Sequence, residues 1–297
     1  MFSSWPWSAR IGAVAWAVAM LVARPPLEVA ALTFAPCVIL PLALSLAVER
    51  VGLFDRLLLT LVQRFLLPAA LLVLASLTLL PQGMFGAALV VPWLGVTAAL
   101  AFIGVRRLRR GEWRRASDLG LTAGLGLIVV GGGWLLLSRL GIRPQEFSHA
   151  IVLLTAVHFH YAGFALPILA ALAAESRPSG AATAGVYLTA FGVPLTGVGI
   201  SLSPPIEIVA VAAVVFGCGL VAGVQLRSAF DRRDPTALTL LAVSSMSLAA
   251  AMVPALLYGW GEWTGRQTWT LPQMISSHGM LNAFGFAFCG LAGRRQN

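Results

Sequence analysis

Apolar stretches of about twenty residues recur along the whole chain, separated by short polar or arginine-rich connections. A helix needs about 20 mostly apolar residues to cross the hydrocarbon core of a bilayer. Because that core holds no water, a helix must satisfy the backbone hydrogen bonds of each stretch. The pattern therefore predicts an all-α, polytopic transmembrane helix bundle of about ten spans. The predicted spans are residues 8–23, 27–48, 65–81, 85–105, 119–140, 148–173, 181–203, 206–225, 237–259 and 271–293.

The first predicted span is the weakest, since only thirteen residues lie between Arg10 and Arg24. It crosses the membrane only if both arginines extend outward to the head groups, or if Trp5 and Trp7 lie in the interface. A nine-span arrangement, with this segment lying on the membrane surface, is the alternative. The longest polar connection has about 13 residues and is too short to fold alone. Residues 1–297 are therefore predicted to form a single integral membrane domain.

The composition agrees with a membrane location. The chain is 59% hydrophobic and 10% charged, whereas about 25% of the residues in an average soluble protein are charged. A net charge of +9 taken alone suits nucleic-acid binding, but the positions of the twenty arginines argue against it. If both termini are cytoplasmic, sixteen arginines lie on the cytoplasmic side, as the positive-inside rule requires. This distribution predicts a multi-pass protein of the bacterial cytoplasmic (inner) membrane that binds no nucleic acid.

The densest arginine run is RRLRRGEWRRASD, residues 106–118. We expect it to set the topology and to contact anionic lipid head groups along Arg106–Arg115. A docking site for a partner or a nucleotide is the alternative, although the chain has no Walker or dinucleotide-binding glycine pattern. The sequence leaves the oligomeric state unknown.

The chain offers few groups for enzyme chemistry. Cys37, Cys218 and Cys289 lie inside apolar stretches and show neither a disulfide framework nor the paired spacing of a zinc site. The chain contains no lysine for Schiff-base chemistry. It also lacks a nucleophile-elbow glycine pattern and an HExxH motif. These features favour a non-enzymatic function.

Three of the four histidines fall at similar depths inside predicted spans. His158 and His160 lie roughly 15–18 Å into the sixth span, and His278 lies roughly 11 Å into the tenth, at 1.5 Å per residue. Polar groups at such depths are costly and often functional. An imidazole can carry a proton, ligate a metal or haem, or hydrogen-bond a solute. We therefore predict a mid-membrane histidine site between these two spans, opening toward the outer face.

Neighbouring polar residues complete the predicted site. His158 and His160 point about 160° apart on a helix and cannot chelate one ion together. We expect Tyr161 and Asn282 to orient the histidines through hydrogen bonds. The polar and small positions of the tenth span form one helical stripe, made of His278, Asn282, Gly285 and Cys289. The residues expected at the outer mouth are Glu28, His149 and Glu207.

The segments HFHYAGFALP (158–167) and SHGMLNAFGF (277–286) resemble the YndJ-like family of bacterial membrane proteins. Members of that family are described as polytopic proteins of about nine spans and are often labelled transporters. The resemblance implies a transporter of a small molecule or ion without implying its substrate. It also strengthens the nine-span alternative.

The sequence leaves two other functions open. SHGM (277–280) is loosely similar to histidine motifs of haem- and copper-binding membrane proteins. A haem- or metal-binding redox or sensor protein would use His158, His160 or His278 as ligands. Four histidines are too few for a six-histidine oxidase centre. In the third alternative the histidines are structural, and the chain is a non-catalytic membrane accessory protein.

Overall fold

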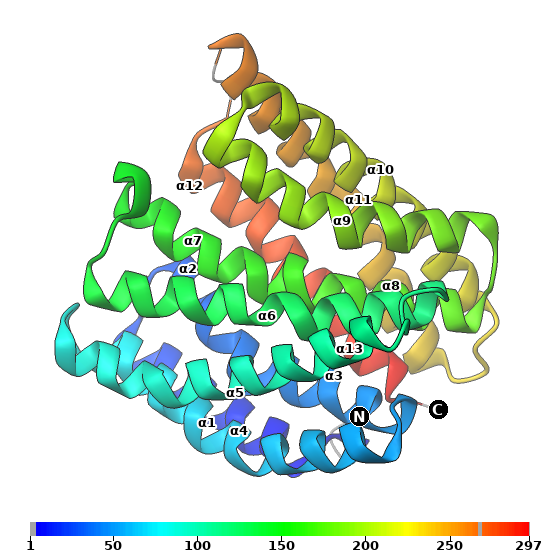
Figure 1. Ribbon diagram of the computed structural model, residues 1–297, viewed down its shortest axis with the longest axis horizontal. Coiled ribbons are helices and arrows are strands. Elements are labelled where there is room, and N and C mark those ends of the chain that lie inside the picture. Colours follow the sequence, from blue (N-terminus) through cyan, green and yellow to red (C-terminus); the bar gives the residue numbers. More distant parts are fainter. Residues whose placement is uncertain (1–3, 267–268, 297) are drawn as a thin grey trace. The chain divides into compact units, whose positions relative to one another are not determined.

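The computed structural model of the protein describes residues 4–266 and 269–296 (Figure 1). These residues form helices and no strands, which confirms the all-α polytopic bundle. Within them, eight helical segments are long and apolar enough to cross a membrane. These segments are Leu27–Arg50, Leu53–Leu79, Met84–Arg109, Ala116–Leu140, His149–Ser176, Gly180–Leu202, Pro205–Phe230 and Pro235–Gly261.

Several of these segments consist of consecutive helical elements. The first half of the chain contains α1 (Trp7–Ala23), α2 (Leu27–Phe34), η2 (Ala35–Ile39), α3 (Leu40–Ala47), η3 (Val48–Arg50), α4 (Leu53–Leu79), α5 (Met84–Arg109) and α6 (Ala116–Leu140). The second half contains η4 (Pro144–Glu146), α7 (His149–His160), η5 (Tyr161–Ala165), α8 (Leu166–Ser176), α9 (Gly180–Leu202), α10 (Pro204–Phe230), α11 (Pro235–Thr264), α12 (Leu271–Met274), η6 (Ile275–Gly279), η7 (Leu281–Phe288) and α13 (Cys289–Arg294).

The two remaining predicted spans, residues 8–23 and 271–293, correspond to the helices at the two ends of the chain. Helix α1 is apolar but has only 17 residues. The tenth predicted span is the helical run from α12 to α13. The choice between nine and ten spans depends on α1 and stays a prediction, as do the cytoplasmic location of both termini and the single membrane domain.

The chain divides into two compact units, each of which is described by itself. Unit 1 contains Met1–Arg110 and Leu125–Ala165, and unit 2 contains Gly111–Gly124 and Leu166–Asn297. The predicted site residues fall into both. Glu28, His149, His158, His160 and Tyr161 belong to unit 1, whereas Glu207, His278 and Asn282 belong to unit 2.

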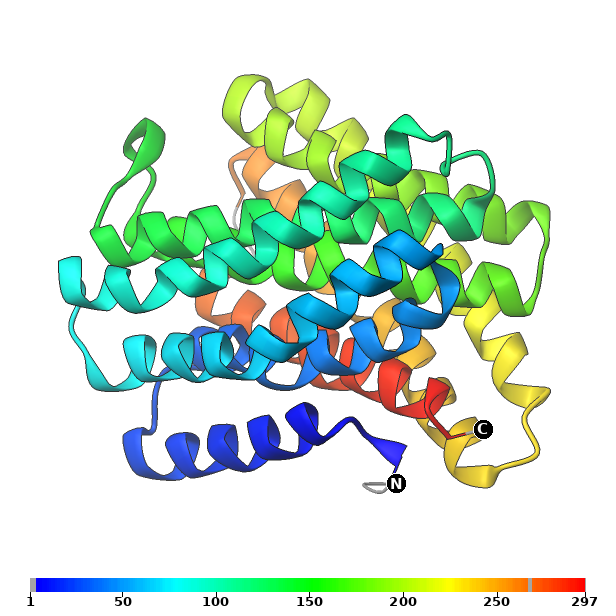
Figure 2. The ribbon, with the colours of Figure 1, turned by 60° about the horizontal axis from the view of Figure 1, so that its bottom comes forward.

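Unit 1 is built around the run from α2 to α3. The most apolar window of this run is 94% buried, as expected for a helix that is hydrophobic on all sides. Helices α4 and α5 pack side by side, and α1 packs on η2 and α4 (Figure 2). Gly12 of α1 lies so close to the carbonyl of Cys37 that any side chain there would clash. Pro41 has no N–H to donate to this carbonyl, which α1 covers instead.

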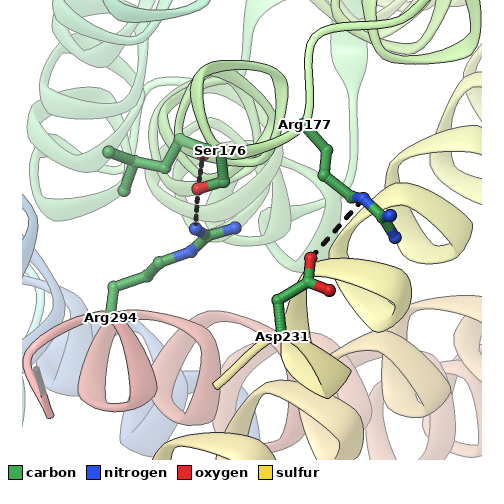
Figure 3. A network of polar contacts seen from close by, with 5 residues as sticks. Ser176, Arg177, Asp231 and Arg294 are labelled. Carbon is green, nitrogen blue, oxygen red and sulfur yellow. Dashed lines mark hydrogen bonds and ion pairs between the residues drawn. The ribbon is translucent and has the colours of Figure 1, made fainter. Parts of the chain in front are cut away.

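Unit 2 contains three neighbouring helices, α9, α10 and α11 (Figure 1). Helix α8 packs on α9 and α10, while η6, η7 and α13 pack along α11. Polar contacts join the ends of these helices (Figure 3). The Arg294 guanidinium donates to the hydroxyl of Ser176, and Arg177 forms an ion pair with Asp231 at 3.5 Å. Because η6 and η7 pack along α11, the stripe that carries His278 lies against protein.

Helix α4 begins at Leu53, twelve residues before the apolar stretch 65–81. Its first turns carry charged residues, which lower the hydropathy but do not end the helix. Asp55 is fully buried and accepts a hydrogen bond from Nε of Arg106 at 2.8 Å. The Arg106 guanidinium also lies 4.0 Å from the centroid of the Phe54 ring. A buried carboxylate needs such a partner, and hydropathy alone does not reveal it.

Four segments within the described residues are π-helical, namely η2, η5, η6 and η7. A π-helix widens the turn and often occurs at functional sites. In η2 the cause is visible, because Pro36 lacks an N–H and the N–H of Leu40 donates to the carbonyl of Ala35. Three of these segments include or directly follow predicted site residues. Tyr161 opens η5, His278 lies in η6, and Asn282 lies in η7.

Candidate functional site

The His160 ring is held at both nitrogens in the core of unit 1. Its Nδ1 lies 2.7 Å from the carbonyl oxygen of Ala156, and its Nε2 lies 3.0 Å from Nε1 of Trp93. A carbonyl only accepts and an indole N–H only donates. Nδ1 therefore carries the hydrogen, and Nε2 accepts from Trp93. The His160 ring is neutral and has no nitrogen left for a solute, a metal or a further proton.

The packing around His160 leaves no room for a ligand. His160 and Trp93 are both 0% exposed. Their ring planes differ by 15°, with centroids 5.8 Å apart, which suits a hydrogen bond directed along the imidazole plane. Gly131 of α6 approaches the imidazole so closely that a methyl group there would clash with Nδ1. A methyl group on the next residue, Gly132, would likewise clash with the hydroxyl of Thr97. These contacts give His160 a structural role inside unit 1.

Tyr161 is also held in place. Its hydroxyl donates to the carbonyl of Ala31 at 2.7 Å, across a sequence separation of 130 residues. The same carbonyl accepts the N–H of Ala35, just where η2 begins. Tyr161 thus ties η5 to the start of η2. The sequence suggests that Tyr161 orients a neighbouring histidine through a hydrogen bond. Its hydroxyl instead donates to the Ala31 carbonyl.

His158 and the outer-mouth residues of unit 1 lie nearer the surface. His158 is exposed, opposite the buried face of His160, as the angular argument predicts. Its ring packs edge-on against Phe159. His149 is exposed at the first position of α7, after the Ser148 cap, and Glu28 is partly exposed in the first turn of α2.

His278 is held firmly at one nitrogen and only weakly at the other. Its Nδ1 lies 2.8 Å from the carbonyl oxygen of Ala251 on α11, so Nδ1 carries the hydrogen. Nε2 is left as an acceptor, and its neighbour is the side-chain nitrogen of Asn282 at 3.3 Å. That nitrogen makes its shorter hydrogen bond, 2.9 Å, to the backbone carbonyl of His278. His278 and Asn282 are both partly exposed. This pair therefore keeps hydrogen-bonding capacity that His160 has lost.

The polar stripe of the C-terminal run faces α11. Gly285 lies against the hydroxyl of Ser247, one helical turn from Ala251. Cys289, at the far end of the stripe, donates its S–H to the carbonyl of Phe284 at 3.3 Å. The start of the run is fixed by a capping box between Thr270 and Gln273. Local capping thus sets where this helix begins.

The polar side chains at the start of the C-terminal run bond to the nearby backbone. The hydroxyls of Ser276 and Ser277 both donate to the carbonyl of Gln273, at 3.2 and 2.6 Å. Glu207 is partly exposed in the first turn of α10, and its backbone lies against Gly199 of α9. An acid in the first turn suits the helix dipole, so Glu207 has a structural explanation at this position.

The arginine run has a mixed environment. Arg106 is engaged by Asp55, and Arg107 is only 1% exposed. Arg109, Arg110, Arg114 and Arg115 are exposed. Of the six arginines in this run, only these four are exposed enough to contact lipid head groups.

Comparison with known proteins places these observations in a family. A family model described as "YndJ-like protein" matches residues 30–286. The chain belongs to the YndJ-like family. It is 30% identical over 205 residues to "Uncharacterized membrane protein YndJ" of Bacillus subtilis (strain 168). The match covers 68% of this chain and 37% of that relative, so the chain spans little more than a third of the relative's length. No solved structure matches.

The YndJ-like match contains every predicted site residue except Glu28. It begins after α1 and ends before α13, so the helix that decides the span count lies outside it. Within residues 4–266 and 269–296, no group of three or more His, Cys, Asp or Glu side chains is placed to hold a metal ion.

Sequence reasoning missed two groups. Trp93, the partner of His160, was not singled out, although an indole N–H deep in an apolar stretch needs an acceptor. Gln225, which is fully buried in α10, was also missed. Its signal was available in the sequence, because a carboxamide inside an apolar span is costly unless it is hydrogen-bonded.

Proposed function

We propose that this multi-pass membrane protein of the YndJ-like family transports a small polar solute or ion and that His278 and Asn282 form part of its binding site. One observation carries the proposal. His278 is anchored through Nδ1 to Ala251, while Nε2 has only a 3.3 Å neighbour and the residue is partly exposed. A fixed ring with an available acceptor is suited to binding.

The chemistry of this pair favours solutes that donate hydrogen bonds. The lone pair of His278 Nε2 and the side-chain oxygen of Asn282 are both acceptors. An amine, a hydroxyl or an amide N–H would satisfy them. Nε2 is also the only position at which this ring can gain a proton, because Nδ1 already carries one. The same atom is therefore suited to proton movement.

His160 has a different role in this proposal. Both of its nitrogens are used, so we assign it to packing inside unit 1. His158 is exposed and stays a candidate for contact with solute or metal. This assignment separates two histidines that the sequence treated as equivalent.

We further propose a bacterial inner-membrane location with both termini in the cytoplasm. The exposed arginines Arg109, Arg110, Arg114 and Arg115 would then contact anionic lipid head groups. The aliphatic and aromatic side chains exposed on α4 and α5, among them Leu57, Phe65 and Phe102, would face lipid tails.

Ligand-induced stabilisation of the purified protein tests the transport proposal. The full chain in mild detergent is melted with a panel of amines, polyols, amino acids and inorganic cations. A ligand that binds only the folded protein raises the melting temperature. We expect a solute that stabilises the wild type but not His278→Ala or Asn282→Ala. Labelled solute should then enter proteoliposomes containing the wild type and not those containing either variant.

Two controls make the result decisive. His158→Ala reports whether an exposed histidine of unit 1 contributes. The visible spectrum and metal content of the purified wild type test the haem or metal alternative. If no solute in the panel stabilises the wild type more than it stabilises the His278 and Asn282 variants, the site assignment is wrong. A Soret band that disappears in His278→Ala would replace transport by haem binding.

A further inference from the structure

A second polar cluster in unit 2 is fully buried and has no part in the proposed solute site. It joins Gln225 of α10 to Ser244 and Ser245 of α11. Nε2 of Gln225 lies 2.8 Å from Oγ of Ser244 and 3.4 Å from Oγ of Ser245. Gln225 and Ser244 are 0% exposed, and Ser245 is 2% exposed. A polar group so completely buried in a helix that is long and apolar enough to cross a membrane is a candidate for function.

The hydroxyl oxygens of Ser244 and Ser245 both direct lone pairs toward Nε2 of Gln225. Ser244 donates its hydrogen to the carbonyl of Phe286 in η7 at 2.7 Å, and Ser245 donates to the carbonyl of Leu241 at 2.8 Å. Since each hydroxyl has only one hydrogen, both oxygens can act only as acceptors toward Gln225. The Gln225 amide N–H group occupies the point where the two sets of lone pairs converge.

The other end of the same amide lacks a partner. Oε1 of Gln225 is buried and has no hydrogen bond within the described residues. An unsatisfied buried oxygen is unfavourable, and native structures contain few of them. A half rotation of the amide would bring Oε1 to the two serine oxygens. While both hydroxyls keep donating to their present carbonyls, three acceptors would then face one another, and a cation between them makes that arrangement favourable.

We infer that Gln225 Oε1, Ser244 Oγ and Ser245 Oγ form a binding site for a monovalent cation of the sodium type. In the absence of the cation, the amide N–H group occupies its place. When the cation binds, the amide rotates and all three ligands are oxygens. These ligands carry no net charge, whereas calcium sites use several carboxylates and zinc sites use nitrogen or sulfur. The cluster therefore suits a hard ion of single charge.

The packing holds the ligands in place. Gly290 of α13 lies so close to the Ser244 hydroxyl that a methyl group there would clash with it. Phe286, whose carbonyl orients Ser244, lies four residues after Asn282 in the same π-helix, η7. Ion occupancy at Ser244 and solute binding at Asn282 thus both act on η7. This coupling rests on the proposed transport function, while the ion site itself does not.

Direct binding of radioactive sodium tests the inference. The full chain in mild detergent is titrated with ²²Na⁺ in a scintillation proximity assay, with choline chloride keeping the ionic strength constant. We expect saturable binding to the wild type. Gln225→Leu and Ser244→Ala should each weaken it by at least about tenfold, since changes near a bound metal commonly weaken affinity 10–100-fold. Ser245→Ala removes the more distant ligand and should have a smaller effect.

Ser247→Ala is the matched control. It removes a serine hydroxyl from the same helix, on the side that faces Gly285, and none of the three proposed ligands. It should bind sodium as the wild type does. Unlabelled lithium should compete with ²²Na⁺, whereas calcium at equal concentration should not. Size-exclusion elution and the melting curve in choline check that each variant is folded.

The outcomes separate the two proposals. A wild type that shows no saturable sodium binding overturns the cation site, whatever the variants do. Equal losses in Ser244→Ala and Ser247→Ala would overturn it as well. Sodium binding that meets these expectations, without any solute acting through His278, leaves the cation site supported and removes the transport proposal. Solute binding that is the same in sodium and in choline, with no ²²Na⁺ bound, overturns the cation site and leaves the transport proposal supported.

Discussion

His160 in unit 1 and His278 in unit 2 both lie in apolar helices, next to or within π-helical segments, yet they are held differently. His160 makes two hydrogen bonds, at 2.7 and 3.0 Å, and is completely buried. His278 makes one good hydrogen bond, at 2.8 Å, and is partly exposed. How tightly the second nitrogen is held therefore separates a structural histidine from a candidate binding histidine better than membrane depth does.

The partners explain the difference. Trp93 is a donor, so it uses the lone pair of His160 that Nδ1–H leaves available. Among the residues that the structure describes, no indole takes the corresponding place beside His278, whose neighbour is the more flexible carboxamide of Asn282. An amide side chain can rotate toward a solute and then return. The comparison predicts large stability effects in unit 1 and large ligand effects with small stability effects in unit 2.

The largest stability effect is expected for Trp93→Ala. It empties the volume of a fully buried indole and leaves Nε2 of His160 without its donor. Large-to-small changes at buried aromatic residues cost about 3–5 kcal/mol. Unfolding in mixed detergent micelles, followed by circular dichroism, gives the change in free energy. Trp93→Phe keeps most of the ring and should cost clearly less. An equal cost for both variants would show that the hydrogen bond matters more than packing.

The next prediction compares the two histidines directly. His160→Leu removes two buried hydrogen bonds and leaves the Trp93 N–H unsatisfied, which costs about 1–3 kcal/mol. His278→Leu removes one interhelical hydrogen bond, and such bonds in membranes average about 0.6 kcal/mol. The same unfolding experiment measures both. If His278→Leu is as destabilising as His160→Leu, the contrast between the two rings fails.

Much of the architecture could be predicted because it depends on hydropathy alone. The membrane sets the length of each helix and requires its backbone to be internally bonded, so apolar stretches gave the helices. Prediction was poorest for the start of α4. There the charged turns around Asp55 continue the helix because Arg106, far along the chain, neutralises a buried carboxylate. A tertiary partner of this kind has no local signal.

The candidate site was also predictable only where local sequence decides it, and not where a partner from another helix does. Helical periodicity placed His158 and His160 on opposite faces and His278, Asn282 and Gly285 on one stripe, since these relations need only the turn angle. It could not show that Trp93 would engage His160 or that the Ala251 carbonyl would engage His278. Both partners come from other helices, and helix packing depends on small residues such as Gly131.

Gly131 tests whether close packing fixes the His160 ring. In Gly131→Ala the new methyl group would clash with Nδ1 of a ring that two hydrogen bonds prevent from moving. Overpacking of this kind costs typically 1–3 kcal/mol. Gly133→Ala, two residues along the same helix, meets nothing within 4 Å and serves as the matched control. Since alanine favours helices over glycine, the control should be neutral or slightly stabilising. Equal effects in the two variants would mean that the His160 ring is free to move.

The smallest stability effect is expected for Asn282→Ala. Its side-chain nitrogen bonds mainly to the backbone carbonyl of His278 in its own helix, so its loss removes little tertiary structure. We expect the free energy of unfolding to change by less than about 1 kcal/mol, within the range for such bonds in membrane helices. Stabilisation by the transported solute should nevertheless disappear. Trp93→Phe supplies the opposite pattern, with lower stability but an unchanged response to the solute. If Asn282→Ala instead unfolds the protein and Trp93→Phe abolishes the solute response, the roles assigned to the two units are reversed.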